Sequence, residues 1–139
     1  MVAATIPDLD GLGIIFGVKY YFQFHHIIFH NLLASILVPA LLSLLGPRRL
    51  FCFILYFGLF NLHILLDSFG SGREWGISYL WPFSDHHFIN PYAWDFQDWQ
   101  NIAALLLMVG ITLFQVKAKR RTPFELVAPR LDRWLLKKL

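Results

Sequence analysis

Three long apolar runs, separated by short polar segments, constrain this chain more than any other feature. The runs cover residues 29–45, 50–66 and 102–116, and only a few polar side chains interrupt them. At about 1.5 Å per residue they extend over roughly 22 to 26 Å, so a few flanking residues let each cross a hydrocarbon core of about 30 Å. A soluble helical bundle is the alternative, but so short a chain has too little polar surface to cover three apolar helices. We therefore predict an all-α fold, a membrane helical bundle with about three transmembrane helices.

The composition supports this class and argues against several others. Charged residues make up 15% of the 139 residues and apolar residues 57%, whereas an average soluble domain carries about 25% charge. The single cysteine, Cys52, lies within an apolar run, so we expect neither a disulfide framework nor a thiolate metal site. There is no basic stripe with interleaved aromatic residues, so we expect no nucleic-acid partner. The first ten residues lack a basic segment, so we expect internal segments to direct membrane insertion.

Lysine and arginine predict how the chain is oriented. Arg48 and Arg49 lie between the first two apolar runs, and four cations follow the third run: Lys117, Lys119, Arg120 and Arg121. Cytoplasmic loops near helix ends collect such residues. The segment 68–100 has Arg73 as its one cation among several carboxylates, so it belongs on the opposite face. We predict a multi-pass protein of the inner membrane with a cytoplasmic C-terminus.

The C-terminal residues have a different pattern. Between residues 122 and 139, apolar residues alternate with cations at helical spacing: Leu126, Leu131, Trp134 and Leu135 among Arg130, Arg133, Lys137 and Lys138. This pattern predicts an amphipathic helix on the anionic cytoplasmic leaflet, with a solvated end as the alternative. We therefore divide the chain into a membrane-embedded metal-site domain, residues 1–121, and an amphipathic cytoplasmic tail, residues 122–139.

Two pairs of metal-ligating residue types stand at helical spacing in or beside the apolar runs. His26 and His30 are four residues apart at the start of the first run, and His63 and Asp67 are four apart at the end of the second. An i, i+4 spacing places two side chains on one face of a helix, as two ligands of one metal require. Ionisable residues within membrane helices are costly, so they are candidates for function.

The two pairs are predicted to meet when the chain folds back at Arg48. The midpoint of the first pair lies 20 residues before Arg48, and the midpoint of the second lies 17 after it. A difference of three residues amounts to about 4.5 Å along a helix axis. Both pairs therefore lie at one membrane level, on the face that the charge distribution makes non-cytoplasmic.

Two more carboxylates, Asp8 and Asp10, are expected on the same side. In an extended chain they would point the same way, although a helix N-cap followed by first-turn charge is an alternative interpretation. Carboxylates with imidazoles suit Zn²⁺, Mn²⁺ or Fe²⁺ better than Ca²⁺. The residues do not select among these three, and we take Zn²⁺ as the first expectation with Mn²⁺ and Fe²⁺ as alternatives. His86 and His87 lie in a polar loop, where a histidine is as readily an ordinary polar residue as a ligand.

Four motifs in order resemble a known family. They are PDLD at 7–10, HHIIFHN at 25–31, LHILLDSFGSG at 62–72 and WPFSDHH at 81–87. Together they resemble the YdjM-like family of membrane-bound proteins, which are inferred to be metal-dependent hydrolases. The resemblance implies metal ligation by Asp8, Asp10, His25, His30, His63 and Asp67. Helical spacing favours His26 over His25, and both stay candidates. His26 stands where the family usually has arginine, and Phe29 where it has threonine.

The resemblance implies a hydrolase that acts on a phosphoester or a lipid-like substrate, with membrane lipid as its surroundings. Asp8 or Asp10, whichever is not a ligand, would act as the general base, and Arg73 could pair with a phosphate. Two other functions fit the same residues. A b-type haem protein would use His30 and His63 as axial ligands, and a non-catalytic protein would use the metal to staple its helices.

Overall fold

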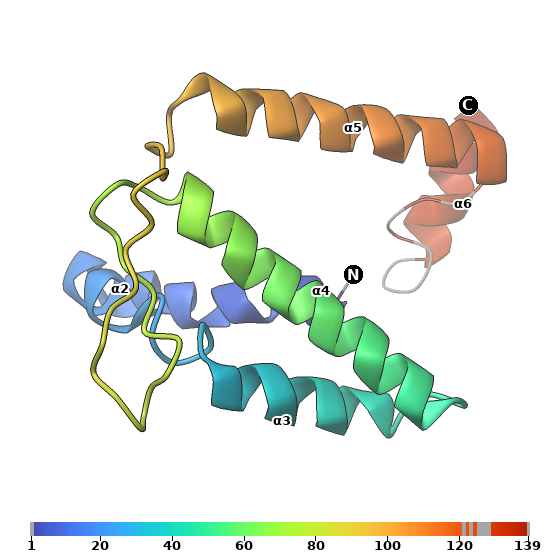
Figure 1. Ribbon diagram of the computed structural model, residues 1–139. Helices are drawn as coiled ribbons and strands as arrows, with labels where there is room; N and C mark the ends of the chain where they lie inside the picture. Colours follow the sequence, from blue (N-terminus) through green and yellow to red (C-terminus); the bar gives the residue numbers. More distant parts are fainter. Residues whose placement is uncertain (1, 121, 123, 125–128, 139) are drawn as a thin grey trace. The chain divides into compact units, whose positions relative to one another are not determined.

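The computed structural model describes residues 2–120, 122, 124 and 129–138, and its regular elements are helical (Figure 1). They are α1 (Val2–Thr5), the 3-10 helix η1 (Pro7–Phe16), α2 (Val18–Phe24), α3 (Leu32–Ser43), α4 (Arg49–Gly70), α5 (Trp99–Lys119) and α6 (Pro129–Lys138). In this described part of the chain, β pairing is limited to an isolated antiparallel bridge between Ile77 and Phe88. The prediction of an all-α fold is confirmed.

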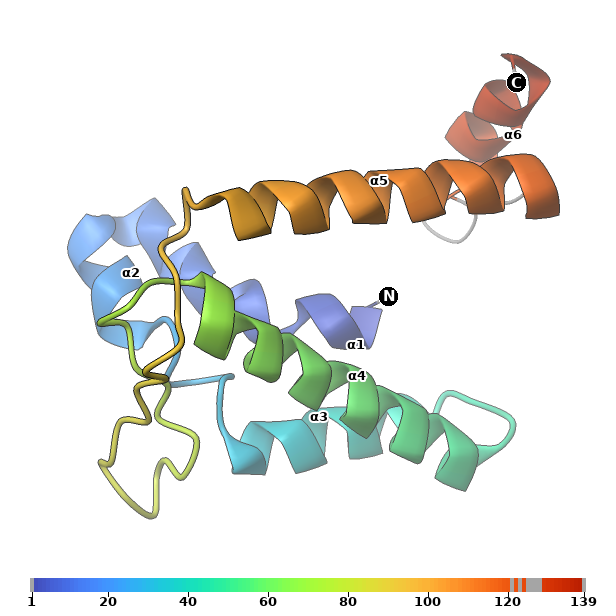
Figure 2. The same ribbon diagram turned by 45° about the horizontal axis from the view of Figure 1, so that its top comes forward.

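Helices α3 and α4 form an antiparallel hairpin that carries the small buried core (Figure 2). Gly46 lets the turn between them approach α4 closely, because a Cβ there would lie 2.5 Å from the Cys52 sulfur and one of the two would have to shift. The core consists of four buried apolar residues from α3, α4 and the following loop: Ala34, Phe60, Ile64 and Ile77. The hairpin thus fixes the register between the two helices, as the predicted reversal near Arg48 requires.

Among the residues that the structure describes, two helices are long and apolar enough to cross a membrane. Helix α4 has 22 residues and α5 has 21, which gives each a length of about 32 Å. Their apolar side chains are largely exposed, as Leu106 (65%) and Leu50 (73%) illustrate, so they are not core helices of a soluble protein. Exposed apolar surface on this scale is suited to lipid. The chain is therefore a helical membrane protein.

The first apolar run is helical over a shorter stretch than the run itself. Helix α3 has 12 residues, or about 18 Å, which is short of a full crossing. The residues just before it form a turn instead, and Asn31 caps the helix at Leu32. The apolar run from residue 29 therefore contributes its first residues to the turn and not to a transmembrane helix.

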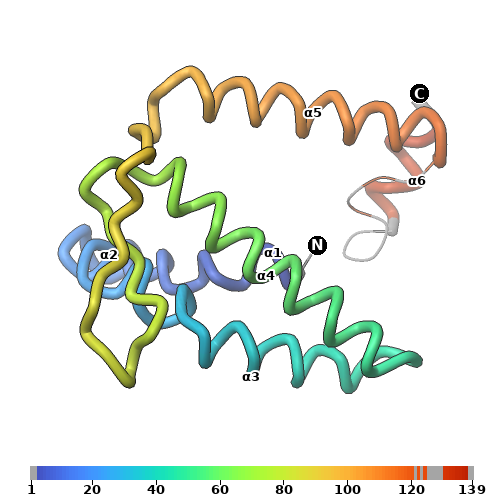
Figure 3. The backbone as a smooth tube through the Cα atoms, viewed as in Figure 1, coloured from blue at the N-terminus to red at the C-terminus, as the bar shows by residue number. Residues whose placement is uncertain are grey.

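The N-terminal elements and the long loop after α4 surround this turn. Helix α1 packs against α4, and α2 packs against η1. The loop folds back on itself through the bridge at Ile77 and lies beside the turn (Figure 3). Two backbone hydrogen bonds join them, from Ser78 N to His26 O at 3.2 Å and from Leu32 N to Tyr79 O at 2.8 Å.

The contacts divide the chain into two compact units, residues 1–96 and 97–139. In the second unit, α5 ends at Lys119, and its C-cap Arg120 has a left-handed conformation. Thr122 donates hydrogen bonds through its backbone nitrogen and its hydroxyl to the Asp132 carboxylate on α6. On α6 itself, Leu131 and Trp134 share one face. Arg121, Pro123, Leu126 and Leu139, which belong to the predicted cation cluster and tail, lie outside the described residues.

Candidate metal centre

The histidine-rich segment between α2 and α3 is a buried turn. Helix α2 ends at its C-cap His25, and His26 follows in the left-handed region with a φ of 68°. The prediction that His26 and His30 share one face of a helix is therefore wrong, because α3 begins only at Leu32. His25, His26 and His30 are nevertheless all buried, and the turn directs them into one cluster.

Asn31 holds this turn together. Its side-chain amide donates to the carbonyl oxygens of Ile27 and Ile28, both at 2.7 Å. Its Oδ1 accepts from Ala34 N at 2.8 Å, which caps α3. The side chain thus links the turn that carries the histidines to the helix that follows. Sequence reasoning missed this role, although an asparagine directly before an apolar run is a recognised N-cap signal.

Asp8 and Asp10 lie in the first turn of η1 and not on an extended strand. The expectation that they point the same way is wrong, because a 3-10 helix turns by about a third of a circle per residue. Asp10 is buried: its Oδ1 lies 2.6 Å from His25 Nδ1, and its Oδ2 lies 3.0 Å from His30 Nδ1 and accepts from Phe29 N at 3.2 Å. Asp8 is half exposed and its Oδ1 lies 3.3 Å from His63 Nε2.

Helix α4 supplies His63 and Asp67 one turn apart, near its C-terminal end. One oxygen of Asp67, Oδ2, is 3.0 Å from His30 Nε2 and 3.0 Å from His63 Nε2. The same oxygen is 3.9 Å from His26 Nε2. As the folding back at Arg48 predicts, the imidazoles of the turn meet the acidic end of α4.

Two groups of these residues have ligand atoms close enough to hold a metal ion. Within each group the atoms lie within 4.8 Å of one another; one group is His25, His26 and His30, and the other is Asp8, His30, His63 and Asp67. The nitrogens fit a metal, because both ring nitrogens of His26 and Nε2 of His63 are buried without a hydrogen-bond partner. Buried polar atoms rarely lack a hydrogen-bond partner, and a bound ion is one explanation where such an atom is found.

Burial and close charges shift the pKa values of the groups in the turn. Burial alone would raise the pKa of Asp10, but hydrogen bonds from His25 and His30 outweigh it and lower this pKa to about 2. Burial, together with repulsion from the other two histidines, lowers the pKa of His26 to about 3. Burial would also lower the pKa of His30, but hydrogen bonds to Asp10 and Asp67 raise it overall. The carboxylate of Asp10 is therefore charged, and His26 is neutral, at physiological pH.

A cavity of about 390 Å³ opens onto the cluster. Asp8, His25 and Asp67 line it, together with Tyr21, Ser71, Trp75 and Phe96. The Trp75 ring stacks on His26 with centroids 4.7 Å apart, and Tyr21 lies 4.7 Å from His25. Both aromatic residues therefore hold imidazoles in place, a role that their positions in the sequence do not indicate.

Three residues that the sequence offered for a role in the site lie away from the cluster: Arg73, as a phosphate partner, and His86 and His87, as candidate ligands. Arg73 pairs with Asp95, its Nε lying 3.6 Å from the carboxylate Oδ2. His87 Nδ1 lies 2.9 Å from the Ser78 hydroxyl, and the exposed His86 packs against Phe88. Neither His86 nor His87 belongs to a metal-capable group of the described residues.

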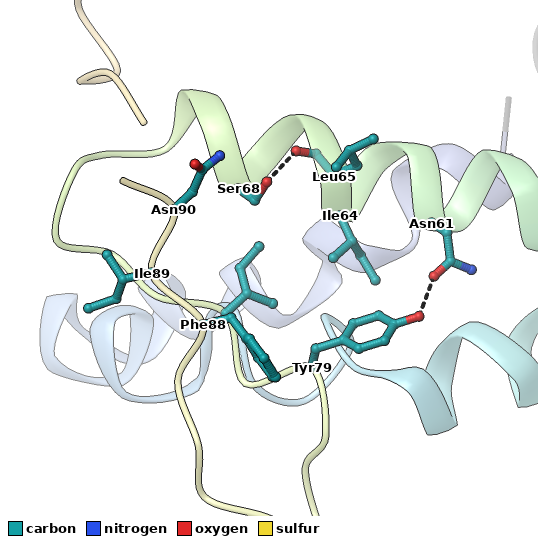
Figure 4. Close-up of a pocket in the computed structure, with 9 residues that line it drawn as sticks. Asn61, Ile64, Leu65, Ser68, Tyr79, Phe88, Ile89 and Asn90 are labelled. Atoms are coloured by element: carbon teal, nitrogen blue, oxygen red, sulfur yellow. Dashed lines mark hydrogen bonds between the residues drawn. The ribbon is translucent and has the colours of Figure 1, made fainter. Parts of the chain in front are cut away.

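Another cavity, of about 480 Å³, lies along a different face of α4 (Figure 4). Its lining is mostly apolar, and Tyr79 donates to Asn61 Oδ1 at 2.7 Å at one end of it. Asn61, Ile64, Leu65 and Ser68 of α4 line this cavity. The Asp67 carboxylate of the same helix instead contacts His30 of the histidine turn. The helix thus separates an apolar cavity from the polar cluster.

The helices and the cluster define a class: a helical membrane protein with buried histidines and aspartates that could hold a metal ion. The chain belongs to the YdjM inner membrane protein family, whose model matches residues 1–131. It is 36% identical over 99 residues to the inner membrane protein YbcI of Escherichia coli (strain K12). The aligned region covers 66% of this chain and 56% of that protein. The chain thus spans little more than half of this relative. No solved structure matches it.

Proposed function

We propose that this protein is a membrane-bound, metal-dependent hydrolase that acts on a phosphoester or lipid-like substrate. The observation that carries the proposal is the convergence of His30, His63 and Asp67, from two separate segments, beside an accessible cavity. Three protein ligands with a further position open to the cavity are typical of catalytic metal sites. Two imidazoles and a carboxylate favour Zn²⁺, with Mn²⁺ and Fe²⁺ as alternatives.

A bound ion of this kind supplies a Lewis acid and lowers the pKa of a water molecule towards about 7. Asp10 is shielded from the cavity and bonded to His25 and His30, so we assign it a positioning role: it holds both rings in orientation, as carboxylates behind metal-bound histidines do. Asp8 is half exposed beside His63 and lines the cavity. Of the two carboxylates, Asp8 is therefore the one placed to accept a proton from water.

The cavities around the cluster suit a substrate with a polar head and an apolar tail. An apolar cavity of about 780 Å³ lies between η1 and α2 and reaches Asp10. On another side, Ser71 and Trp75 belong both to the cavity at the cluster and to a neighbouring cavity that Arg73 lines. Arg73 is thus available to a phosphate group that extends from the cluster, once it exchanges Asp95 for the phosphate.

The haem alternative is less well supported by the same geometry. Oδ2 of Asp67 lies 3.0 Å from Nε2 of both His30 and His63. A haem iron would have to stand between these nitrogens, where the structure has a carboxylate. The metal-staple alternative predicts a closed site, and the cavity beside Asp8 and Asp67 favours the catalytic version.

The orientation and domain division are part of the same proposal. His63 and Asp67 lie about 21 and 27 Å along α4 from Arg49, so the cluster is near the end away from the arginines. With Arg48 and Arg49 in the cytoplasm, the site is at the non-cytoplasmic face. We also keep residues 1–121 as the metal-site domain and 122–139 as an amphipathic cytoplasmic tail.

The test is metal content and activity together. Protein purified in detergent is expected to contain a transition metal in stoichiometric amount and to hydrolyse phosphodiester substrates in mixed micelles. His63→Ala and Asp67→Ala should each lose most of the activity and bind less metal than the wild type, because each removes a ligand. The control is His86→Ala, which changes an exposed histidine outside the cluster. Wild-type protein without metal, or ligand variants with unchanged metal and activity and an unchanged circular dichroism spectrum, would contradict the proposal.

A further inference from the structure

His26 is buried in the cluster, yet the three-ligand site leaves it without a function. Its exposed fraction is 1%, and neither ring nitrogen has a hydrogen-bond partner. Its ring lies against three others, those of Trp75, His30 and His25, with centroids 4.7, 4.6 and 4.5 Å away. A buried imidazole with both nitrogens unused is unfavourable unless something else binds to it.

The backbone at His26 keeps this ring inside. A φ of 68° is uncommon for a residue other than glycine, and structures keep such conformations mainly where the surroundings enforce them. Here Ser78 N donates to the carbonyl oxygen of His26 at 3.2 Å and anchors the turn to the following loop. An unfavourable backbone conformation therefore places the His26 imidazole where no protein group forms a hydrogen bond with it.

The missing partner is suggested by the neighbouring rings. His25, His26 and His30 each offer a nitrogen, and these atoms lie within 4.8 Å of one another. This group is distinct from Asp8, His30, His63 and Asp67, but the two share His30. They also adjoin through Asp67, because its Oδ2 lies 3.9 Å from His26 Nε2.

We propose that His25 and His26 supply a second divalent-metal position beside the first, with the Asp67 carboxylate shared between the two, so that the centre takes two adjacent ions. This inference rests on the proposed function and narrows it. Paired ions about 3.5–4 Å apart are characteristic of phosphatases and nucleases, where they bind the attacking and leaving oxygens of a phosphoryl group. The substrate class that we assign to such a centre is therefore a phosphoester.

The experiment counts metal ions per chain. Detergent-purified full-length protein is loaded with Zn²⁺, desalted and analysed for zinc, and Co²⁺ titration followed by visible absorption counts the sites independently. His26→Phe keeps an aromatic ring against Trp75 but removes both nitrogens. If that variant does not fold, His26→Asn replaces it, because asparagine tolerates a left-handed backbone. His86→Ala is the matched control.

We expect two ions in the wild type and in His86→Ala, and one ion in His26→Phe. His63→Ala should lose the other ion, and the double variant should lose both. One ion in the wild type that His26→Phe retains would overturn the second position and leave the hydrolase proposal standing. Two ions in His26→Phe would also overturn it. No ion in the wild type would remove both proposals together.

Discussion

Asp67 is the residue through which α4 meets the histidine turn. Its Oδ2 lies within 4 Å of three imidazole nitrogens, those of His26, His30 and His63. A charged carboxylate in a membrane helix is costly unless neighbouring groups share its charge. Sharing occurs here because one turn of helix separates Asp67 from His63, and the hairpin brings His30 to the same level.

Asp10 provides the sharpest residue-scale prediction. Asp10→Asn keeps the size of the side chain but replaces a charged acceptor of His25 and His30 with a neutral amide. We expect zinc affinity to fall by about 10- to 100-fold, as for other groups that orient metal ligands, with the protein still folded. Competition with a chromogenic chelator measures the affinity. Asp85→Asn, in an exposed loop, is the control, and equal affinities in the two variants would show that Asp10 does not position the ligands.

At this scale the sequence predicts the positions of the site residues on α4 better than the positions of those in the histidine turn. His63 and Asp67 lie within a continuous apolar helix, so their spacing determines that they share a face. For His25 and His26, position depends on where α2 stops and on the left-handed backbone at His26, and neither can be read from apolar periodicity. The sequence left both as candidates, and both lie in the cluster.

At the scale of elements, the turn from His25 to Asn31 depends on the start of α3. The hydrogen bonds of Asn31 to Ile27, Ile28 and Ala34 join the two. The apolar run that begins at residue 29 does not reveal this division, because turn and helix are equally apolar there. Local hydrogen bonding by one asparagine decides where the helix begins.

Asn31 can therefore be tested with two substitutions that separate its roles. Asn31→Asp keeps an acceptor for Ala34 N but cannot donate to the Ile27 and Ile28 carbonyls. Asn31→Ala loses both roles, and the lost cap alone should lower the free energy of unfolding by about 1 kcal/mol. We expect metal affinity to fall in both variants and thermal stability to fall further in Asn31→Ala. Unchanged zinc affinity in Asn31→Asp would show that the amide does not organise the histidine turn.

At the scale of the whole molecule, the fold class follows from composition and the apolar runs, because so few charges cannot cover three apolar segments in water. Family membership agrees with this prediction, as do two described helices that are long and apolar enough to span a membrane. The extent of α3 could not be predicted in the same way. The start of α3 is also joined to a distant segment by the hydrogen bond from Leu32 N to Tyr79 O, and apolar runs do not reveal such a contact.

The last prediction concerns the orientation of the chain across the membrane. The cations stand at the start of α4 and at the end of α5. Arg48 and Arg49 lie at the start of α4, and Lys117 and Lys119 lie in the last turn of α5, so both places should be cytoplasmic.

Cysteine labelling tests this orientation. In a Cys52→Ser background, which removes the single cysteine, Asp85→Cys should react with a membrane-impermeant maleimide in intact cells. Lys137→Cys should react only after the cells are opened. Val109→Cys, in the middle of α5, should stay unlabelled in both states because lipid surrounds it. Labelling of both loop and tail from the same side would mean that α5 does not cross, and the reverse pattern would place the metal centre in the cytoplasm.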